Sequence, residues 1–245
     1  MDIRQLVLVC EKKDEAINNL CNLFDIKVAY HDPGIIFFGL ENALLPVGNS
    51  FIEVISPVEE GTTAGRFLER RKGDGGYMVI IQVDDFSDVQ NNVKENNITV
   101  VWESEHPEAR AIHLHPKEMG GAILSLDWMN PKESWKWAGP NWDKFVNTRT
   151  IKRFVGVEIQ SDVPEEMKNT WQAVLKVPSE KVFDYQINLD NTWIRFVKDH
   201  DGRGPGVSAF CLEANNKEAL LKKASDLGLI SEENIMIGGV KFLLS

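Results

Sequence analysis

Two strand-like segments, SFIEVISP at residues 50–57 and AILSLDW at residues 122–128, close their parts of the chain in the same way. Each ends a stretch that opens with an alternating apolar strand, continues with an amphipathic helix and finishes in short strands. A recurring unit of this kind constrains the fold more than any single motif does. The first half of the chain is therefore predicted to contain one βαβββ module twice, at residues 1–57 and 75–128.

Apolar spacing and turn residues predict the elements of both modules. In the first module these are a strand at 3–10, a helix at 13–24 and short strands at 27–30, 34–39, 42–47 and 51–55. In the second they are a strand at 77–83, a helix at 85–96 and strands at 99–103, 111–115 and 122–126. The segment between them, 59–76, is rich in Gly, Thr and charge and is expected to be a linker.

A connector at residues 131–148 is expected to separate an N-terminal domain, 1–130, from a shorter C-terminal domain, 149–245. The connector holds Trp135, Trp137 and Trp142, which either fasten it to the domain or line a ligand groove. The C-terminal domain repeats the element order, with a truncated final module. Its predicted elements are strands at 154–160, near Phe183, at 193–197, 207–212 and 240–244, and helices at 164–175 and 217–227.

Charge and composition exclude several classes of function. The chain has 245 residues, a formal net charge of −10 and a single basic cluster at residues 70–72, which argues against binding to a nucleic-acid backbone. No apolar run approaches the roughly 18 residues of a membrane span, and the first residues lead straight into a strand rather than a signal segment. We therefore expect a cytoplasmic protein with no membrane partner, whose three cysteines are reduced.

The repeated modules resemble the vicinal oxygen chelate superfamily, which includes glyoxalase I, methylmalonyl-CoA epimerase, extradiol dioxygenases and bleomycin-resistance proteins. The resemblance covers nearly the whole chain. It is carried by IRQLVLVCEKKDEAINNLCNLF at 3–24, SFIEVISP at 50–57, GDGGYMVIIQVDD at 73–85 and IHLHPKEMGGAILSLDW at 112–128. It implies an α+β fold in which four βαβββ modules pair into two domains with cup-shaped mixed sheets.

In that superfamily, a divalent metal is held by one residue from the first strand and one from the last strand of each module. The matching positions in the first module are Gln5 and Glu53, and both residue types can be ligands. The matching positions in the second module are Met78 and Ser125, which are poor ligands for a hard cation. The resemblance thus implies a weak site for Zn, Mn, Co, Ni or Fe at Gln5 and Glu53, unless a neighbour contributes: His113, His115 or Asp127, which would be a shifted acidic ligand.

Glu53 is the strongest candidate for a functional residue. It lies in an otherwise apolar strand, and burying a carboxylate is costly unless it is paired, coordinated or protonated. A raised pKa would let Glu53 act as a general base beside a substrate carbonyl, as glyoxalase- and epimerase-type reactions require. The structural alternative is a salt bridge to Arg4, Arg66 or Arg70.

Three further groups of residues are candidates for contact with a substrate. His113 and His115 alternate on one strand and therefore share a face, so His115 is a candidate general acid and His113 a candidate substrate contact. The alternative is that His115, which precedes Pro116, only hydrogen-bonds the turn there. The glycine-rich segment 73–76 enters a strand rather than a helix, which argues against a nucleotide cofactor. It is instead expected to place Tyr77 and Met78 at the mouth of the cup.

Arg66 lies just before that segment and is a candidate contact for an acidic or CoA-type ligand. The alternative is that Arg66, Arg70 and Arg71 pair with nearby glutamates: Glu59, Glu60 and Glu69.

Two functions remain open from the sequence. The first is an enzyme of the glyoxalase or epimerase type, a lyase or isomerase that moves a proton in a small α-oxo or acyl-thioester compound, with or without a metal. The second is a non-catalytic binder of a small molecule, like the resistance proteins, and Met78 and Ser125 favour it. An extradiol dioxygenase is disfavoured because the matching positions lack two histidines and a carboxylate. The chain is expected to be a monomer or a homodimer.

Overall fold

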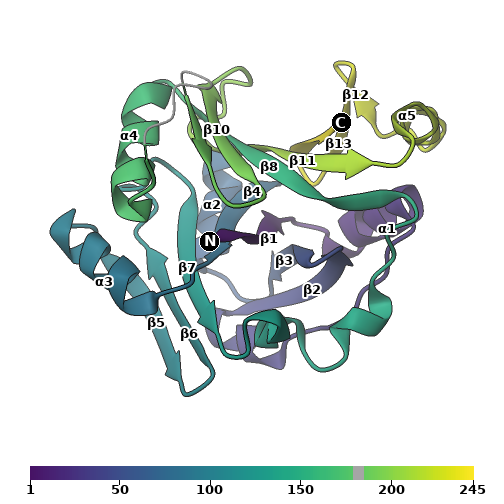
Figure 1. The fold of residues 1–245 in the computed structure, drawn as a ribbon. Coiled ribbons are helices and arrows are strands. Elements are labelled where there is room, and N and C mark those ends of the chain that lie inside the picture. The colour runs from purple at the N-terminus through teal and green to yellow at the C-terminus, as the bar shows by residue number, and fades with distance from the viewer. Residues whose placement is uncertain (179–184) are drawn as a thin grey trace.

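The computed structural model describes residues 1–178 and 185–245. Within these ranges the N-terminal half forms one curved sheet with the strand order β2-β3-β1-β4-β7-β6-β5 (Figure 1). Its strands are β1 (Asp2–Val9), β2 (Leu40–Val47), β3 (Ser50–Pro57), β4 (Gly75–Gln82), β5 (Val100–His106), β6 (Ala109–Leu114) and β7 (Ile123–Met129).

Two similar modules meet at the centre of this sheet. In the first, β1 is parallel to β3, which pairs antiparallel with β2; in the second, β4 is parallel to β7, which pairs antiparallel with β6. The central strands β1 and β4 are antiparallel, with Leu6 opposite Val79. The predicted repeat of one module is thus confirmed in the pairing of its strands.

Two of the helices in this half lie where apolar spacing predicts them. Helix α1 (Lys13–Phe24) has the predicted bounds, buries its apolar stripe and ends at Asp25 in the left-handed region. Helix α3 (Phe86–Glu95) begins after Asp85, whose carboxylate accepts hydrogen bonds from the backbone N–H groups of Ser87 and Asp88.

The segment expected to be a linker contains a third helix, α2 (Thr63–Arg71). The Thr62 hydroxyl accepts a hydrogen bond from the N–H of Gly65 and so caps the helix. Its buried residues recur at helical spacing: Ala64, Phe67, Leu68 and Arg71. The linker prediction was therefore wrong. The sequence pattern did not reveal the helix because its apolar stripe is short and lies among charged residues.

The strand predicted at 34–39 is also wrong. This apolar run forms the 3₁₀ helix η1 (Pro33–Phe38), which buries none of its residues. The Asp32 carboxylate accepts a hydrogen bond from the N–H of Gly34, and Gly39 ends the turn at a φ of 68°. Capping and turn chemistry at Asp-Pro-Gly outweigh the β propensity of the residues that follow. The strand predicted at 27–30 is reduced to one bridge between Tyr30 and Leu44.

The C-terminal half forms a second group of strands in the order β9-β10-β8-β11-β14-β13-β12. Its strands are β8 (Ile151–Ser161), β9 (Gln186–Asn188), β10 (Trp193–Lys198), β11 (Gly206–Ala214), β12 (Ile230–Ser231), β13 (Asn234–Ile237) and β14 (Val240–Leu244), with helices α4 (Pro164–Leu175) and α5 (Lys217–Asp226). Three strands follow α5, so the expectation of a truncated final module was wrong. The strand predicted near Phe183 lies outside the described residues.

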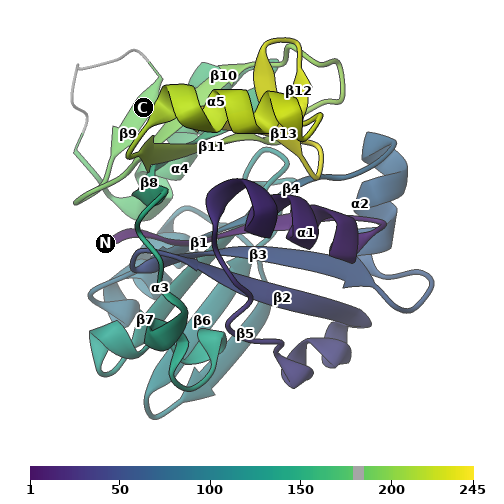
Figure 2. The same ribbon diagram turned by 90° about the vertical axis from the view of Figure 1, so that its right-hand side faces the viewer.

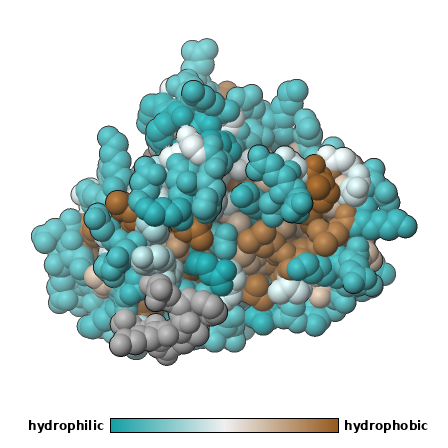
Figure 3. Space-filling model, turned by 90° about the horizontal axis from the view of Figure 1, so that it is seen from above, coloured by the Kyte–Doolittle hydropathy of each residue, from teal (hydrophilic) through white to brown (hydrophobic). Residues whose placement is uncertain are grey.

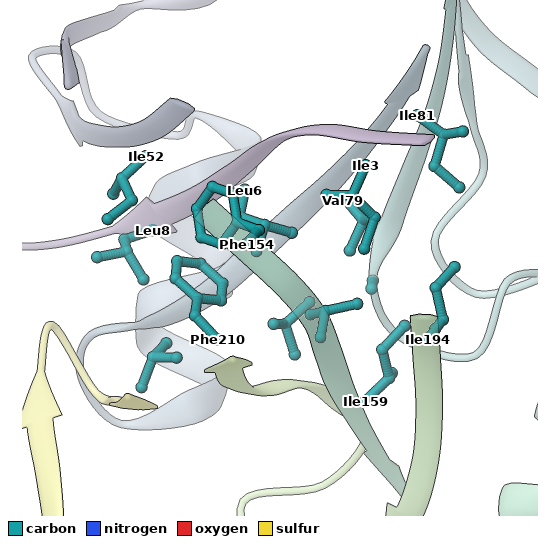
Figure 4. Close-up of a cluster of buried hydrophobic side chains, with 14 of the residues drawn as sticks. Ile3, Leu6, Leu8, Ile52, Val79, Ile81, Phe154, Ile159, Ile194 and Phe210 are labelled. Atoms are coloured by element: carbon teal, nitrogen blue, oxygen red, sulfur yellow. The ribbon is translucent and has the colours of Figure 1, made fainter. Parts of the chain in front are cut away.

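The two halves pack against each other through an apolar core. The C-terminal strands lie over the N-terminal sheet (Figure 2), and β11 joins β4 where Val207 pairs with Gly76. Figure 4 shows side chains of both halves in one cluster, for example Leu6 and Ile52 with Phe154 and Phe210. The outer surface of the C-terminal half, seen from above, is largely hydrophilic with a group of hydrophobic residues near its middle (Figure 3).

Alternation along β1 therefore directs Leu6 and Leu8 into the core between the halves and Gln5, Val7 and Val9 to the opposite, concave face. The connector crosses this concave side in three short 3₁₀ helices, η2 (Lys132–Ser134), η3 (Lys136–Ala138) and η4 (Trp142–Phe145). No helix of the described residues is long and apolar enough to span a membrane.

Candidate functional site

The concave face of the N-terminal sheet encloses a cavity of about 1450 Å³. Strands from both modules line it, together with η1 and the connector. Its floor is mainly apolar, with side chains such as Val7, Leu44, Met78 and Ile80. A few polar groups on an apolar background are typical of a small-molecule site.

Glu53 faces this cavity from β3 and is the centre of a buried polar cluster. Its Oε2 accepts a hydrogen bond of 2.6 Å from Gln5 Nε2, and its Oε1 accepts one of 2.6 Å from Asn42 Nδ2. Trp135 Nε1 in turn donates to Gln5 Oε1 at 2.9 Å, and the backbone N–H of Asp32 donates to Asn42 Oδ1 at 2.8 Å.

These outer contacts fix the orientation of both amides. An indole N–H and a backbone N–H can only donate, so the atoms that face Trp135 and Asp32 must be the carbonyl oxygens of Gln5 and Asn42. The NH₂ group of each amide therefore points at Glu53. Both carboxylate oxygens of Glu53 are acceptors, which orients the side chain and leaves only its remaining lone pairs for a ligand.

The environment of Glu53 shifts its proton affinity strongly. Burial raises the pKa of Glu53 to about 7, an effect that the hydrogen bonds from Asn42 and Gln5 partly offset. No salt bridge reaches Glu53 within the described part of the chain, so the alternative of pairing with Arg4, Arg66 or Arg70 was wrong. Glu53 is instead satisfied by neutral amides and can change its charge near pH 7.

A second buried carboxyl, Asp127, faces the same cavity from β7. Its Oδ1 lies 2.5 Å from Ser125 Oγ, and its Oδ2 accepts a hydrogen bond of 2.6 Å from Trp137 Nε1. Burial raises the pKa of Asp127 to about 7, and the contacts with Ser125 and Trp137 lower it only in part. The cavity therefore holds two carboxyl groups that change charge near neutral pH.

The two histidines proposed from the sequence both line the cavity but differ in environment. His113 packs between aromatic rings, with its centroid 4.3 Å from that of Trp102 and 6.5 Å from that of Phe38. Burial lowers the pKa of His113 to about 3, so it is neutral at physiological pH. The His115 Nδ1 atom accepts a hydrogen bond from the backbone N–H of Lys117 at 3.2 Å, which leaves Nε2 as the donor nitrogen.

The remaining predicted residues lie around the same space. Met78 and Tyr77 line the cavity, and burial raises the pKa of Tyr77 to about 12. Ser125 is fully buried, and its hydroxyl contacts Asp127 rather than open space. Arg66 lines the rim, where its guanidinium donates to the carbonyl oxygen of Gly61.

The residues present do not fit a chelated divalent metal. Gln5 directs its oxygen to Trp135 and its NH₂ group to Glu53, and an N–H donor cannot coordinate a cation. The strand register places Met78 and Ser125 at the positions in the second module that Gln5 and Glu53 occupy in the first, because Val7 lies opposite Glu53 and Ile80 opposite Ser125. The Met78 thioether is not a ligand for a hard cation, and the Ser125 hydroxyl is a poor one that already bonds to Asp127. Among the described residues, no group of three or more His, Cys, Asp and Glu side chains is arranged to hold a metal.

Three residues of the two polar clusters were not predicted as site residues: Asn42, which donates to Glu53, Trp135, which donates to Gln5, and Trp137, which donates to Asp127. Asn42 carries a signal that the sequence does show, because it is the polar residue on the cavity face of β2 beside Leu40 and Leu44. The tryptophans were considered only as aromatic surfaces, whereas their N–H groups make the decisive contacts.

Two solved structures have a similar fold over nearly the whole length of this chain. A variant of 4-hydroxymandelate synthase from Streptomyces coelicolor matches over 93% of this chain and 75% of its own, with a TM-score of 0.69 and 14% identity. A hypothetical protein from Staphylococcus aureus matches over 99% of this chain and 98% of its own, with a TM-score of 0.68 and 12% identity.

The chain has a two-domain vicinal oxygen chelate fold. The α+β prediction, with paired βαβββ modules and cup-shaped sheets, is thereby confirmed.

Sequence relatives match only part of this chain. Bovine mitochondrial methylmalonyl-CoA epimerase is 27% identical over 92 residues, which are 36% of this chain and 53% of that protein. Ethylmalonyl-CoA/methylmalonyl-CoA epimerase from Cereibacter sphaeroides is 27% identical over 94 residues, 36% of this chain and 69% of that protein. The chain thus spans about half the length of the mammalian relatives that it matches. No known protein-family model matches it.

Proposed function

We propose that the N-terminal cup binds a small carbonyl compound, either an α-oxo compound or an acyl thioester, and moves a proton at the carbon beside the carbonyl. The observation that carries this proposal is the state of Glu53, a buried carboxyl that faces the cavity and has a pKa of about 7. A general base works best when its pKa lies near the working pH. The epimerase relatives in sequence support the same class of reaction.

In this reaction the Glu53 carboxylate removes the proton, and the electrons of the C–H bond move toward the carbonyl oxygen to give an enolate. Gln5 and Asn42 hold both Glu53 oxygens in place, so that the remaining lone pairs face the cavity. Fixed orientation of the base avoids reorganisation during the proton transfer. Because the donor set does not fit a divalent metal, no step of this scheme uses one.

A second function has its own support. Met78 and Ser125 stand at ligand positions without being ligands, and the cavity floor is mainly apolar. These features favour a protein that holds a small apolar molecule without changing it, as a sequestering protein does. The two functions differ in whether a bound compound exchanges protons with water.

Proton exchange in D₂O separates the two functions. The probes are methylmalonyl-CoA for the acyl thioesters and 2-oxobutanoate for the α-oxo compounds, and the readout is deuterium at the carbon beside the carbonyl, measured by mass spectrometry. We expect the wild-type protein to exchange at least one probe, and Glu53→Gln to lose about 10²-fold or more of that rate.

Glu41→Gln is the matched control, since Glu41 is an exposed carboxylate on the neighbouring strand β2. It should keep the wild-type rate. Binding of either probe without exchange by the wild-type protein would contradict the catalytic proposal and favour sequestration.

A further inference from the structure

Asp127 is the second buried carboxyl of the cavity, and nothing in the scheme above uses it. It is 2% exposed, it lines the cavity, and no salt bridge reaches it within the residues that the structure describes. A buried acidic group without a cationic partner is costly to keep unless it has a task or remains protonated.

The contacts of Asp127 allow it to hold a proton on one defined oxygen. Trp137 Nε1 can only donate, so Oδ2 must accept from it. The proton of the neutral acid therefore resides on Oδ1, 2.5 Å from the Ser125 hydroxyl. That hydroxyl can accept from a protonated Oδ1 and donate toward the carbonyl oxygen of Ile112 at 3.4 Å, or it can rotate and donate to Oδ1. Both charge states of Asp127 thus have a hydrogen-bond partner.

Glu53 differs from Asp127 in this respect. Both of its oxygens face NH₂ groups whose orientation is fixed, and such donors favour the carboxylate form. Asp127 has one oxygen beside a rotatable hydroxyl that serves the acid as well as the anion. The hydrogen bonds therefore prepare Glu53 to accept a proton and Asp127 to donate one.

We propose that Asp127 is a further catalytic residue, which donates its proton to the carbonyl oxygen of the bound compound while Glu53 removes the proton from the neighbouring carbon. This inference rests on the proposed function. The C–H bond breaks, its electron pair forms the C=C bond, and the electrons of the C=O bond take the proton of Asp127 to give a neutral enol. For this transfer the O–H of Asp127 turns from Ser125 to the carbonyl oxygen, and the Ser125 hydroxyl then donates to the Asp127 carboxylate. Reversal returns each proton, so no oxidant, reductant or metal is required.

A buried neutral acid of this kind supplies the stabilisation that a cation would otherwise give to the developing oxyanion. It also explains why a cavity whose second module has no ligand at Met78 or Ser125 can still polarise a carbonyl. Ser125 in particular hydrogen-bonds the acid from the position that matches a metal ligand in the superfamily.

The test is the pH dependence of proton exchange with the same probes, methylmalonyl-CoA and 2-oxobutanoate. Exchange that needs ionised Glu53 and protonated Asp127 gives a bell-shaped profile, which rises and then falls around pH 7. In Asp127→Asn the amide keeps the shape and can still accept from Trp137, but it has no proton to give. We expect its rate at pH 7 to fall about tenfold to a hundredfold and the decline on the alkaline side to disappear.

Other titratable groups along the cavity must be separated from Asp127. Lys136 is paired with Glu108, and His113 remains neutral above its pKa of about 3. His106 and His115 also line the cavity, so His106→Gln and His115→Gln are the controls, and both should keep the alkaline decline.

A second readout does not depend on catalysis. The indole N–H of Trp137 contacts Asp127 directly, so its ¹H and ¹⁵N chemical shifts should follow the ionisation of Asp127 and titrate near pH 7. This titration should vanish in Asp127→Asn and persist in Glu53→Gln.

The outcomes distinguish this inference from the proposed function. If the wild-type protein exchanges a probe and Glu53→Gln does not, but Asp127→Asn keeps both the rate and the alkaline decline, the role of Asp127 is wrong and the proposed function stands. If the wild-type protein exchanges neither probe, both fall together. An unchanged Trp137 resonance between pH 5 and 9 would also overturn the role of Asp127.

Discussion

Replacement of Asp127 by asparagine should make the protein more stable at alkaline pH, although it removes a group that we consider catalytic. Folding raises the pKa of Asp127 from its ordinary 3.8 to about 7 because the carboxyl is buried. The folded state therefore binds the proton more tightly than the unfolded state. The stabilisation from protonated Asp127 is complete below pH 3.8 and is lost as the pH rises to 7 and above.

The magnitude follows from that shift in pKa. Each pKa unit corresponds to about 1.4 kcal/mol, so charged Asp127 lowers the free energy of unfolding above pH 7 by about 4 kcal/mol relative to the protonated form. Asparagine is neutral at every pH and avoids this loss. Its carbonyl can accept from Trp137, and its NH₂ group can donate to Ser125, so the local hydrogen bonds survive.

Thermal unfolding followed by circular dichroism at pH 5, 7 and 9 measures the effect. At pH 5, which lies above the ordinary pKa of 3.8, about 2 kcal/mol of the stabilisation from protonated Asp127 has already been lost. We therefore expect Asp127→Asn to unfold about 5 °C above the wild-type temperature at pH 5 and about 10 °C above it at pH 9, given about 2–4 °C per kcal/mol for a chain of this size. Glu95→Gln, at an exposed position of α3, is the control for the loss of one charge. Parallel curves for wild type and Asp127→Asn across this range would show that burial does not perturb Asp127, and the reasoning would be refuted.

Three further outcomes follow from the described contacts. Trp135→Phe leaves the buried Gln5 oxygen without its donor, and it should lower the free energy of unfolding by about 1–3 kcal/mol in urea denaturation. Treatment with a chelator should shift the unfolding temperature by less than about 1 °C, because only a bound metal would add stability; a larger drop would show a metal site. Arg71→Met removes a buried guanidinium that donates to the carbonyl oxygens of residues 203–205, and it should cost about 3 kcal/mol, whereas Lys72→Met, at an exposed position, should cost little.

The fold was predictable where apolar residues dominate long, regular segments. Helices α1 and α4 have the predicted bounds because their buried residues recur at helical spacing. The errors fall on short elements. Helix η1 carries an apolar run of which no residue is buried, and the four buried residues of α2 lie among charged ones. Strand β12 has only two residues, both exposed, and β13 has only four, so the complete final module was missed.

The site was predictable in part, for a physical reason. Glu53 could be identified because a carboxylate in an apolar strand needs a compensating contact, and alternation gave its direction. Its partners could not be derived in the same way. The sequence suggested arginines, whereas the contacts come from Gln5 and Asn42, and Trp135 lies 130 residues from the Gln5 that it orients. Contacts at such separations depend on how the connector crosses the cup, and local patterns do not encode that path.

In the proposed function, the connector orients polar groups of the cup. Trp135 turns the Gln5 amide so that it donates to Glu53, and Trp137 fixes which oxygen of Asp127 carries a proton. Both tryptophans lie outside the repeated modules, in the segment that links them to the C-terminal half. The modules alone supply a curved sheet and two buried carboxyls. Gln5, Asn42 and Ser125, which contact these carboxyls, belong to the modules, whereas the N–H groups of Trp135 and Trp137 reach the same clusters from the connector. In the proposed scheme, two proteins with the same paired modules can therefore differ in reaction when their connectors differ.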